Sequence, residues 1–150
     1  MRARASTRLL AFLMVSGPMA GALASSDYSP PTIDAFLHGI RTYPYVASDT
    51  RRARIKAGVP RLTQCMPAAE VRKHLGEPDF GYVAYRAGTA GKVPSKRIWN
   101  YVLEKRAATE TEPGSRVVVW LENDGRLRAV TVHGAPDIES FISRNGPGCQ

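Results

Sequence analysis

Residues 116–133, RVVVWLENDGRLRAVTVH, decide the fold, because they have the pattern of a β-hairpin. The first half, residues 116–122, is dense in β-branched and aromatic side chains, which favour a strand. The sequence Asn123-Asp124-Gly125 is a turn, and Gly125 suits the left-handed backbone that such turns need. Residues 126–133 are predicted to return as the second strand.

A three-residue turn predicts the register of this hairpin. One face of the pair then holds the aliphatic side chains Val117, Val119, Leu121, Leu127 and Ala129. The other face has an ion pair of Glu122 with Arg126, and a cation–π contact of Arg128 with the opposite Trp120. A two-residue turn would place Leu121 opposite Arg128 and Glu122 opposite Leu127, so we expect the first register.

Patterns of period two predict further strands before the hairpin. Residues 98–105 alternate and place Trp99, Tyr101 and Leu103 on one side. Residues 80–86 predict a weaker strand, because Gly81 interrupts them. The polar or glycine-rich segments 87–96 and 106–115 are predicted loops.

Residues 25–31 are predicted to be a loose N-terminal lead, and a helix is predicted to follow them. Thr32 is the expected N-cap of this helix, which stops by Tyr43-Pro44. Another short helix is expected at the opposite end of the chain, opening at Pro136.

A second, basic helix is predicted over residues 51–57, capped by Asp49 or Thr50 and ended by Gly58. It carries four cations. Such a run can be a binding patch, but a solvated helix face is its commoner meaning.

A third helix is predicted over residues 68–75, with Pro67 at its first position and Gly76 as its stop. The whole layout predicts an α+β fold: N-terminal helices, an antiparallel meander of three to four strands, and a short C-terminal helix, with the helices packed on one face of the sheet. The expected divisions are a signal peptide (1–24), an N-terminal lead and helix (25–48) and one α+β domain (49–150).

The first 24 residues have the pattern of a secretory signal peptide cleaved after Ala24. An apolar run at residues 9–15 leads to the A-x-A sequence at 22–24, and the segment has three arginines and no acid: Arg2, Arg4 and Arg8. The alternative is a membrane anchor, but the run is shorter than the ~20 residues that span a bilayer. We expect a periplasmic or secreted protein that is not a lipoprotein, since no cysteine lies near the cleavage site.

Export also bears on the two cysteines, Cys65 and Cys149, which would lie in an oxidising compartment. We predict that they form a disulfide, the alternative being two unpaired thiols. A catalytic thiol is disfavoured, because the sequence supplies no base beside either cysteine.

Charge and motifs exclude several classes of function. Without residues 1–24 the chain keeps 18 basic and 13 acidic residues, a net charge of 18 − 13 = +5. We expect no nucleic-acid partner, because the chain has no recognisable nucleic-acid-binding motif. We also expect no catalytic residues, metal or cofactor: the sequence has no phosphate-binding loop or nucleophile elbow, and the histidines are isolated, namely His38, His74 and His133.

Four short motifs resemble the SmpA/OmlA (BamE-like) domain family: CMPAAEV at 65–71, LGEP at 75–78, IWNYVL at 98–103, and the hairpin around Asn-Asp-Gly at 117–132. The fold of β-lactamase inhibitor proteins is similar to that of this family. The chain departs from the family pattern at Cys65, where the family usually has glycine, in lacking the lipoprotein cysteine, and in the additional residues 80–96. The resemblance implies an exported protein-binding module.

An open sheet face is the candidate binding surface, because helices are expected on one face only. The candidate residues are Trp120, Arg128, Tyr101 and Trp99, since Trp, Tyr and Arg dominate interface energetics. A place in the core is an equal alternative for Trp99. The expected partner is another envelope protein; the alternative function is an inhibitor or immunity protein that blocks a secreted enzyme.

Overall fold

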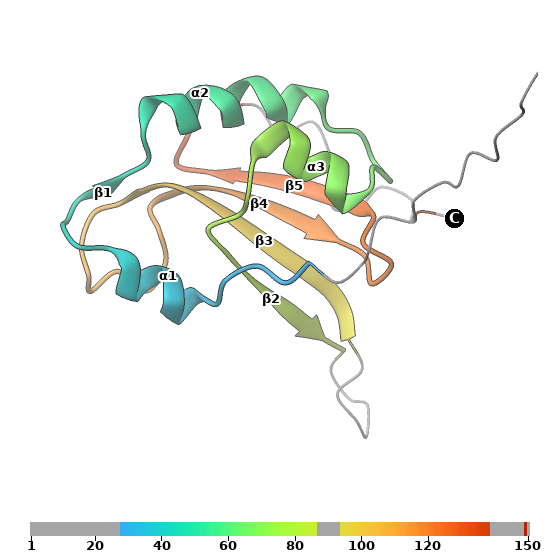
Figure 1. Cartoon of the computed structure of the whole chain (residues 1–150), viewed down its shortest axis with the longest axis horizontal. Coiled ribbons are helices and arrows are strands. Elements are labelled where there is room, and N and C mark those ends of the chain that lie inside the picture. Colours follow the sequence, from blue (N-terminus) through green and yellow to red (C-terminus); the bar gives the residue numbers. More distant parts are fainter. Residues whose placement is uncertain (1–27, 87–93, 139–148, 150) are drawn as a thin grey trace, which may run out of the picture.

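The computed structural model describes residues 28–86, 94–138 and 149. The fold is α+β: in the described residues, three α-helices accompany one antiparallel sheet of five strands (Figure 1). In chain order the elements are α1 (Ile33–Gly39), β1 (Tyr45–Val46), α2 (Asp49–Gly58), the 3-10 turn η1 (Val59–Arg61), α3 (Ala68–Leu75), β2 (Phe80–Tyr85), β3 (Pro94–Lys105), β4 (Ser115–Leu121) and β5 (Leu127–His133).

The predicted meander is present, since β2, β3, β4 and β5 follow one another across the sheet. The sheet also contains β1, a strand that was not predicted. It pairs Tyr45 with Lys105 and Val46 with Glu104, on the same edge of β3 that β2 occupies further along. Two residues are too few to show any periodicity, so the expectation of three to four strands was too low.

The strand β3 begins at Pro94, four residues before the predicted start, because the ladder with β2 continues as far as Tyr85 opposite Pro94. The expected loop over residues 87–96 therefore loses its last three residues to the strand. Its other residues, 87–93, lie outside the described residues.

The helix caps are partly as predicted. The Thr32 hydroxyl accepts a hydrogen bond from the Ala35 amide at 3.2 Å, which confirms the start of α1. For α2 the prediction of Asp49 or Thr50 was wrong. Ser48 caps this helix by accepting from the Arg51 amide at 3.3 Å, and the helix begins two residues earlier.

Helix α3 is bounded by a proline at its start and a glycine at its end. Pro67 is its N-cap, with ψ 144°, rather than its first helical residue, and Gly76 ends it with φ 87°, a conformation that suits glycine. The segment that leads into α3 forms hydrogen bonds with the hairpin. The Cys65 amide donates to the Leu127 carbonyl, and the Ala68 amide donates to the Gly125 carbonyl, both at 2.8 Å. This pairing joins the helical layer to the hairpin.

The predicted hairpin register holds only at the turn. Gly125 has φ 79°, and Leu121 lies opposite Leu127 as expected. Beyond this pair a bulge leaves Arg128 without a cross-strand partner, so Trp120 lies opposite Ala129 instead of Arg128. A bulge adds one residue to one strand and shifts every later pair, and a pattern of alternating side chains cannot reveal it.

The main core lies between the sheet and the pair α2 and α3, which run side by side over one face (Figure 1). Helix α1 is placed differently. Its Phe36 ring contacts the rings of Tyr45 and Phe80, with centroids 5.5 and 5.6 Å apart, so this helix packs beside β1 and β2. The prediction that the helices share one face holds for α2 and α3 and not for α1.

The end of the N-terminal lead is ordered onto the sheet, contrary to the expectation of a loose segment. The Tyr28 ring meets the Trp99 ring edge-on at 5.5 Å, and the Arg72 guanidinium lies 3.9 Å from the Tyr28 ring centre. Pro31 accepts a hydrogen bond from the Gly81 amide at 2.9 Å. Partial burial, followed by the nearby Glu77 carboxylate, raises the pKa of Tyr28 to about 12.

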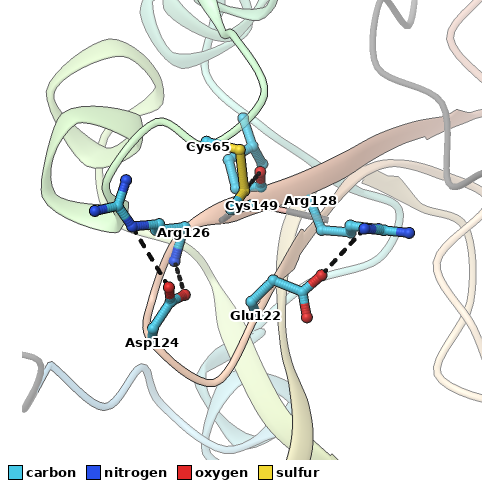
Figure 2. Close-up of a disulfide and its surroundings, with 7 residues drawn as sticks. Cys65, Glu122, Asp124, Arg126, Arg128 and Cys149 are labelled. Atoms are coloured by element: carbon cyan, nitrogen blue, oxygen red, sulfur yellow. Dashed lines mark hydrogen bonds and ion pairs between the residues drawn. A yellow bond between two sulfur atoms is a disulfide. The ribbon is translucent and has the colours of Figure 1, made fainter. Parts of the chain in front are cut away.

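The predicted disulfide is present: Cys65 and Cys149 are bonded, with their Cα atoms 5.4 Å apart and 84 residues apart in sequence (Figure 2). Most of the predicted C-terminal helix falls on residues 139–148, which lie outside the described residues. The described residues at its expected start, 136–138, form a turn.

Candidate interaction surface

The structure separates the four predicted binding residues into two groups. Trp99 and Tyr101 point into the core, with only 2% and 0% of their surface exposed. The Tyr101 hydroxyl donates to the Gly76 carbonyl at 3.2 Å, so its polar atom is satisfied inside the protein. Buried side chains cannot contact a partner, and these two residues leave the candidate set.

Trp120 lies on the other face of the sheet, which α2 and α3 do not cover. Cross-strand pairing places Tyr82, Ile98 and Trp120 in one row over β2, β3 and β4. Ile98 is buried, whereas Tyr82 is 54% exposed and Trp120 is partly exposed. The indole nitrogen of Trp120 donates to the Thr131 hydroxyl at 3.2 Å, which fixes the ring against β5.

Arg128 is held within the protein. Its guanidinium lies 3.5 Å from a Glu122 carboxylate oxygen, and its side chain is one-fifth exposed. The predicted pair of Glu122 with Arg126 is wrong: Arg126 turns to Asp124, at 3.4 Å, on the opposite side of the hairpin (Figure 2). The bulge at Arg128 causes this exchange, because it brings Arg128 beside Glu122.

The largest group of exposed apolar side chains in the described residues lies on one strand, β2. Tyr82, Val83 and Tyr85 are 54%, 39% and 51% exposed. Of the described strands, only β3 pairs with β2, so its other side is an edge of the sheet. We call this strip, made by Tyr82, Val83 and Tyr85, the β2 edge; the sequence predicted a weak strand here and no site.

A groove of about 300 Å³ lies beside the β2 edge, between that strand and the N-terminal lead. Tyr28 and Pro30 form one wall, and Val83, Arg97 and Trp99 line the other part. The lead packs tightly here: a Cβ atom on Gly81 would come within 2.3 Å of Pro30. The glycine that weakened the strand prediction is what lets the lead lie against the strand.

The basic run on α2 is mostly used inside the protein. Arg51 pairs with Asp79 at 2.8 Å, Lys56 pairs with Asp137 at 3.1 Å, and Arg54 donates to three carbonyls at the C-terminal end of α3. Those carbonyls carry the negative end of the helix dipole, which a guanidinium complements. Three of the four cations thus make contacts within the protein, although Arg54 and Lys56 remain exposed and Lys56–Asp137 is a surface pair that contributes little to stability.

Asp79 is the most buried carboxylate of these pairs. It lies between β1 and β2, at a point where neither strand pairs with that edge of β3, and accepts a hydrogen bond from the Val102 amide at 2.6 Å. Burial raises the pKa of Asp79, and the Arg51 guanidinium and the Val102 amide partly oppose this shift. The carboxylate replaces a missing strand bond, which is a structural role.

Two further features bear on function. Within the described residues no group of three or more His, Cys, Asp or Glu side chains is placed to hold a metal ion. None of the helices in those residues is long and apolar enough to cross a membrane.

Neither a family model nor a curated protein nor a solved structure matches this chain.

Proposed function

We propose that this chain is an exported, non-catalytic module of the cell envelope that binds another protein. The observation that carries the proposal is the concentration of exposed apolar and aromatic side chains on the β2 edge. Large apolar groups gathered on one exposed strip mark interaction sites, and tyrosine is among the residues that contribute most to binding energy. Of these side chains, Tyr82 lies in the same cross-strand row as Trp120, on the face of the sheet that α2 and α3 do not cover.

Export supports the envelope setting of this proposal. The pattern of residues 1–24 is that of a cleaved signal peptide. The Cys65–Cys149 bridge is of the kind that persists in oxidising compartments. The two together support a periplasmic or secreted localisation.

The resemblance to the SmpA/OmlA (BamE-like) family also supports the proposal. Cys65 has φ 67°, a conformation favoured by glycine, and it stands where that family usually has glycine. A positive φ at this position is the conformation for which glycine is suited, which supports the resemblance. The lipoprotein cysteine of the family is absent, so we propose a protein-binding role without an anchored place in the outer-membrane assembly machine.

Affinity capture from an envelope extract tests the proposed function. The oxidised chain from Ser25 onward should retain a defined envelope protein, and Tyr82→Ser should lower the captured amount by about tenfold, because an interface aromatic contributes about 1–2 kcal/mol or more. Val46→Ser is the matched control, since Val46 is an exposed apolar residue on another short strand of the same sheet.

Three outcomes decide the matter. Capture of an envelope component that Tyr82→Ser weakens and Val46→Ser spares supports the proposal. Capture of a hydrolase or toxin that loses its activity on binding would replace it by the inhibitor or immunity function. Equal capture by all three proteins would remove the β2 edge as the binding site.

A further inference from the structure

A hollow of about 300 Å³ lies in the helical layer and shares no lining residue with the groove beside the β2 edge. It is bordered by the C-terminal half of α2, by η1 and by the C-terminal end of α3. Four of its six lining residues are basic, and none of the six is acidic: Arg54, Ala57, Gly58, Arg61, Lys73 and His74. The hollow therefore differs in chemistry from the apolar surface proposed to bind a protein.

Two small residues leave this hollow open. A Cβ atom on Gly58 would come within 2.8 Å of the His74 carbonyl oxygen, so α2 and α3 approach each other closely at this point. Ala57 and Gly58 have no long side chain that could fill the space beside this contact. The long basic side chains are left to line it.

The guanidinium of Arg54 is held in place and keeps its charge. Its Nε donates to the His74 carbonyl at 3.4 Å, and its Nη2 donates to the carbonyls of Arg72 and Lys73 at 3.3 and 3.0 Å. These acceptors are uncharged. Its Nη1 donates to no group in the described part of the chain, so its two N–H bonds stay available for a ligand.

The other basic residues of the hollow differ in their partners. Arg61 is exposed and forms no hydrogen bond or ion pair with any residue that the structure describes. Lys73 pairs with Glu70 at 2.5 Å, so these two charges offset each other. The neutral His74 ring adds one N–H donor in either tautomer.

The hollow keeps a positive charge after these partners are counted. The three fixed cations that line it and the one acid that pairs with them, Glu70, leave a net charge of +2. The carbonyl end of α3 contributes about half a negative charge, which lowers the sum to roughly +1.5. A phosphomonoester carries a charge of about −1.5 to −2 at pH 7, and its oxygens match the donors of a guanidinium. A single carboxylate has less charge and balances the hollow less well.

We infer that the hollow between α2, η1 and α3 binds a phosphomonoester, with Arg54 and Arg61 donating hydrogen bonds to its phosphate oxygens. This inference goes beyond the proposed function, because it concerns a second site with a ligand of its own. The volume of the hollow is at the lower end of the ~300–1,000 Å³ of small-molecule sites, which leaves room for a small organic group on the phosphate. A soluble ester and a lipid headgroup share this chemistry, and the experiment distinguishes them.

Glycerol phosphate is the soluble probe, and the amide chemical shifts of the oxidised protein in NMR spectra measure its binding. We expect saturable shifts at the amides of Gly58 and Arg61, with a Kd of about 1 mM at low salt. Glycerol at the same concentrations should cause no such shifts, because it lacks the phosphate. Shifts that glycerol reproduces would overturn the inference.

Two substitutions with opposite expected effects test the charge of the site. Arg61→Gln removes a cation that holds no other described residue, so the fold should persist while binding weakens about three- to fivefold. Glu70→Gln removes the acid that offsets Lys73 and should strengthen binding about twofold. Arg41→Gln is the matched control, since Arg41 is also exposed and has no partner among the described residues, but does not line the hollow. An equal loss in Arg41→Gln would show attraction by the whole surface and contradict the inference.

Vesicles of phosphatidylcholine with and without phosphatidic acid identify the source of the phosphate, because phosphatidic acid has a phosphomonoester headgroup. Sedimentation with vesicles that requires phosphatidic acid and is weakened by Arg61→Gln assigns the hollow to a lipid. Binding of glycerol phosphate alone, with the same sensitivity, assigns it to a soluble ester. The inference fails if neither probe binds, or if Arg61→Gln and Glu70→Gln leave the binding of both probes unchanged.

Discussion

Replacing both Cys65 and Cys149 by serine should lower the free energy of unfolding by about 4 kcal/mol, because the bridge closes a loop of about 85 residues and restricts the unfolded chain. Urea unfolding of the oxidised wild type and of the double-serine variant measures the difference. The wild type with its disulfide reduced should match the variant. Equal stability of the oxidised wild type and the variant would show that the bridge contributes nothing.

A matched variant separates the bridge from the backbone conformation at the same position. Cys65 has φ 67°, where residues other than glycine are disfavoured by about 1–2 kcal/mol. The pair Cys65→Gly with Cys149→Ser should therefore recover about 1 kcal/mol relative to the double-serine variant. If glycine is no better than serine here, the left-handed backbone at residue 65 is not a source of instability.

Replacing Asp79 by alanine should lower the free energy of unfolding by about 2–3 kcal/mol. The change removes the acceptor of the Val102 amide and the partner of Arg51 at the same time. The cost stays below that of a fully buried pair, because the Arg51 side chain is one-quarter exposed and can regain water. Asp79→Asn keeps an oxygen for the Val102 amide and should cost less, so a larger loss for Asn than for Ala contradicts this account.

The pH dependence of the same pair gives an independent measurement. Burial raises the pKa of Asp79 above its ordinary 3.8, so the folded protein keeps this proton to higher pH than the unfolded chain does. The proton-linked part of the Asp79 contribution, which is separate from its hydrogen bond to Val102 and its contact with Arg51, is full below pH 3.8 and is lost as the pH rises through the folded value. The stability of the wild type minus that of Asp79→Asn should therefore fall with rising pH across this window, and a rise would contradict the direction of the shift.

Sequence patterns predicted the parts of the fold that depend on residues close together in the chain. The hairpin turn at Gly125, the strands β3, β4 and β5 and the cap at Thr32 are local, because a few neighbouring residues determine each of them. The strand β1 is two residues long and exists only because β3 offers it an edge. The bulge at Arg128 depends on packing across the sheet, which alternation along one strand does not encode.

The candidate surface was harder to predict than the fold. Trp99 and Trp120 are both tryptophans on strands, and only the three-dimensional packing shows that one is core and the other partly exposed. The β2 edge was missed because the position of a strand within a sheet is a property of topology.

Export is the claim on which the disulfide and the envelope partner both depend, and the N-terminus of the native protein tests it most directly. The protein is recovered from separated envelope and cytosolic fractions of its own cell, and its intact mass and N-terminal sequence are determined. We predict a chain outside the cytosol that begins at Ser25 and has no titratable thiol before reduction. A cytosolic chain that begins at Met1 with two reactive thiols would contradict the account.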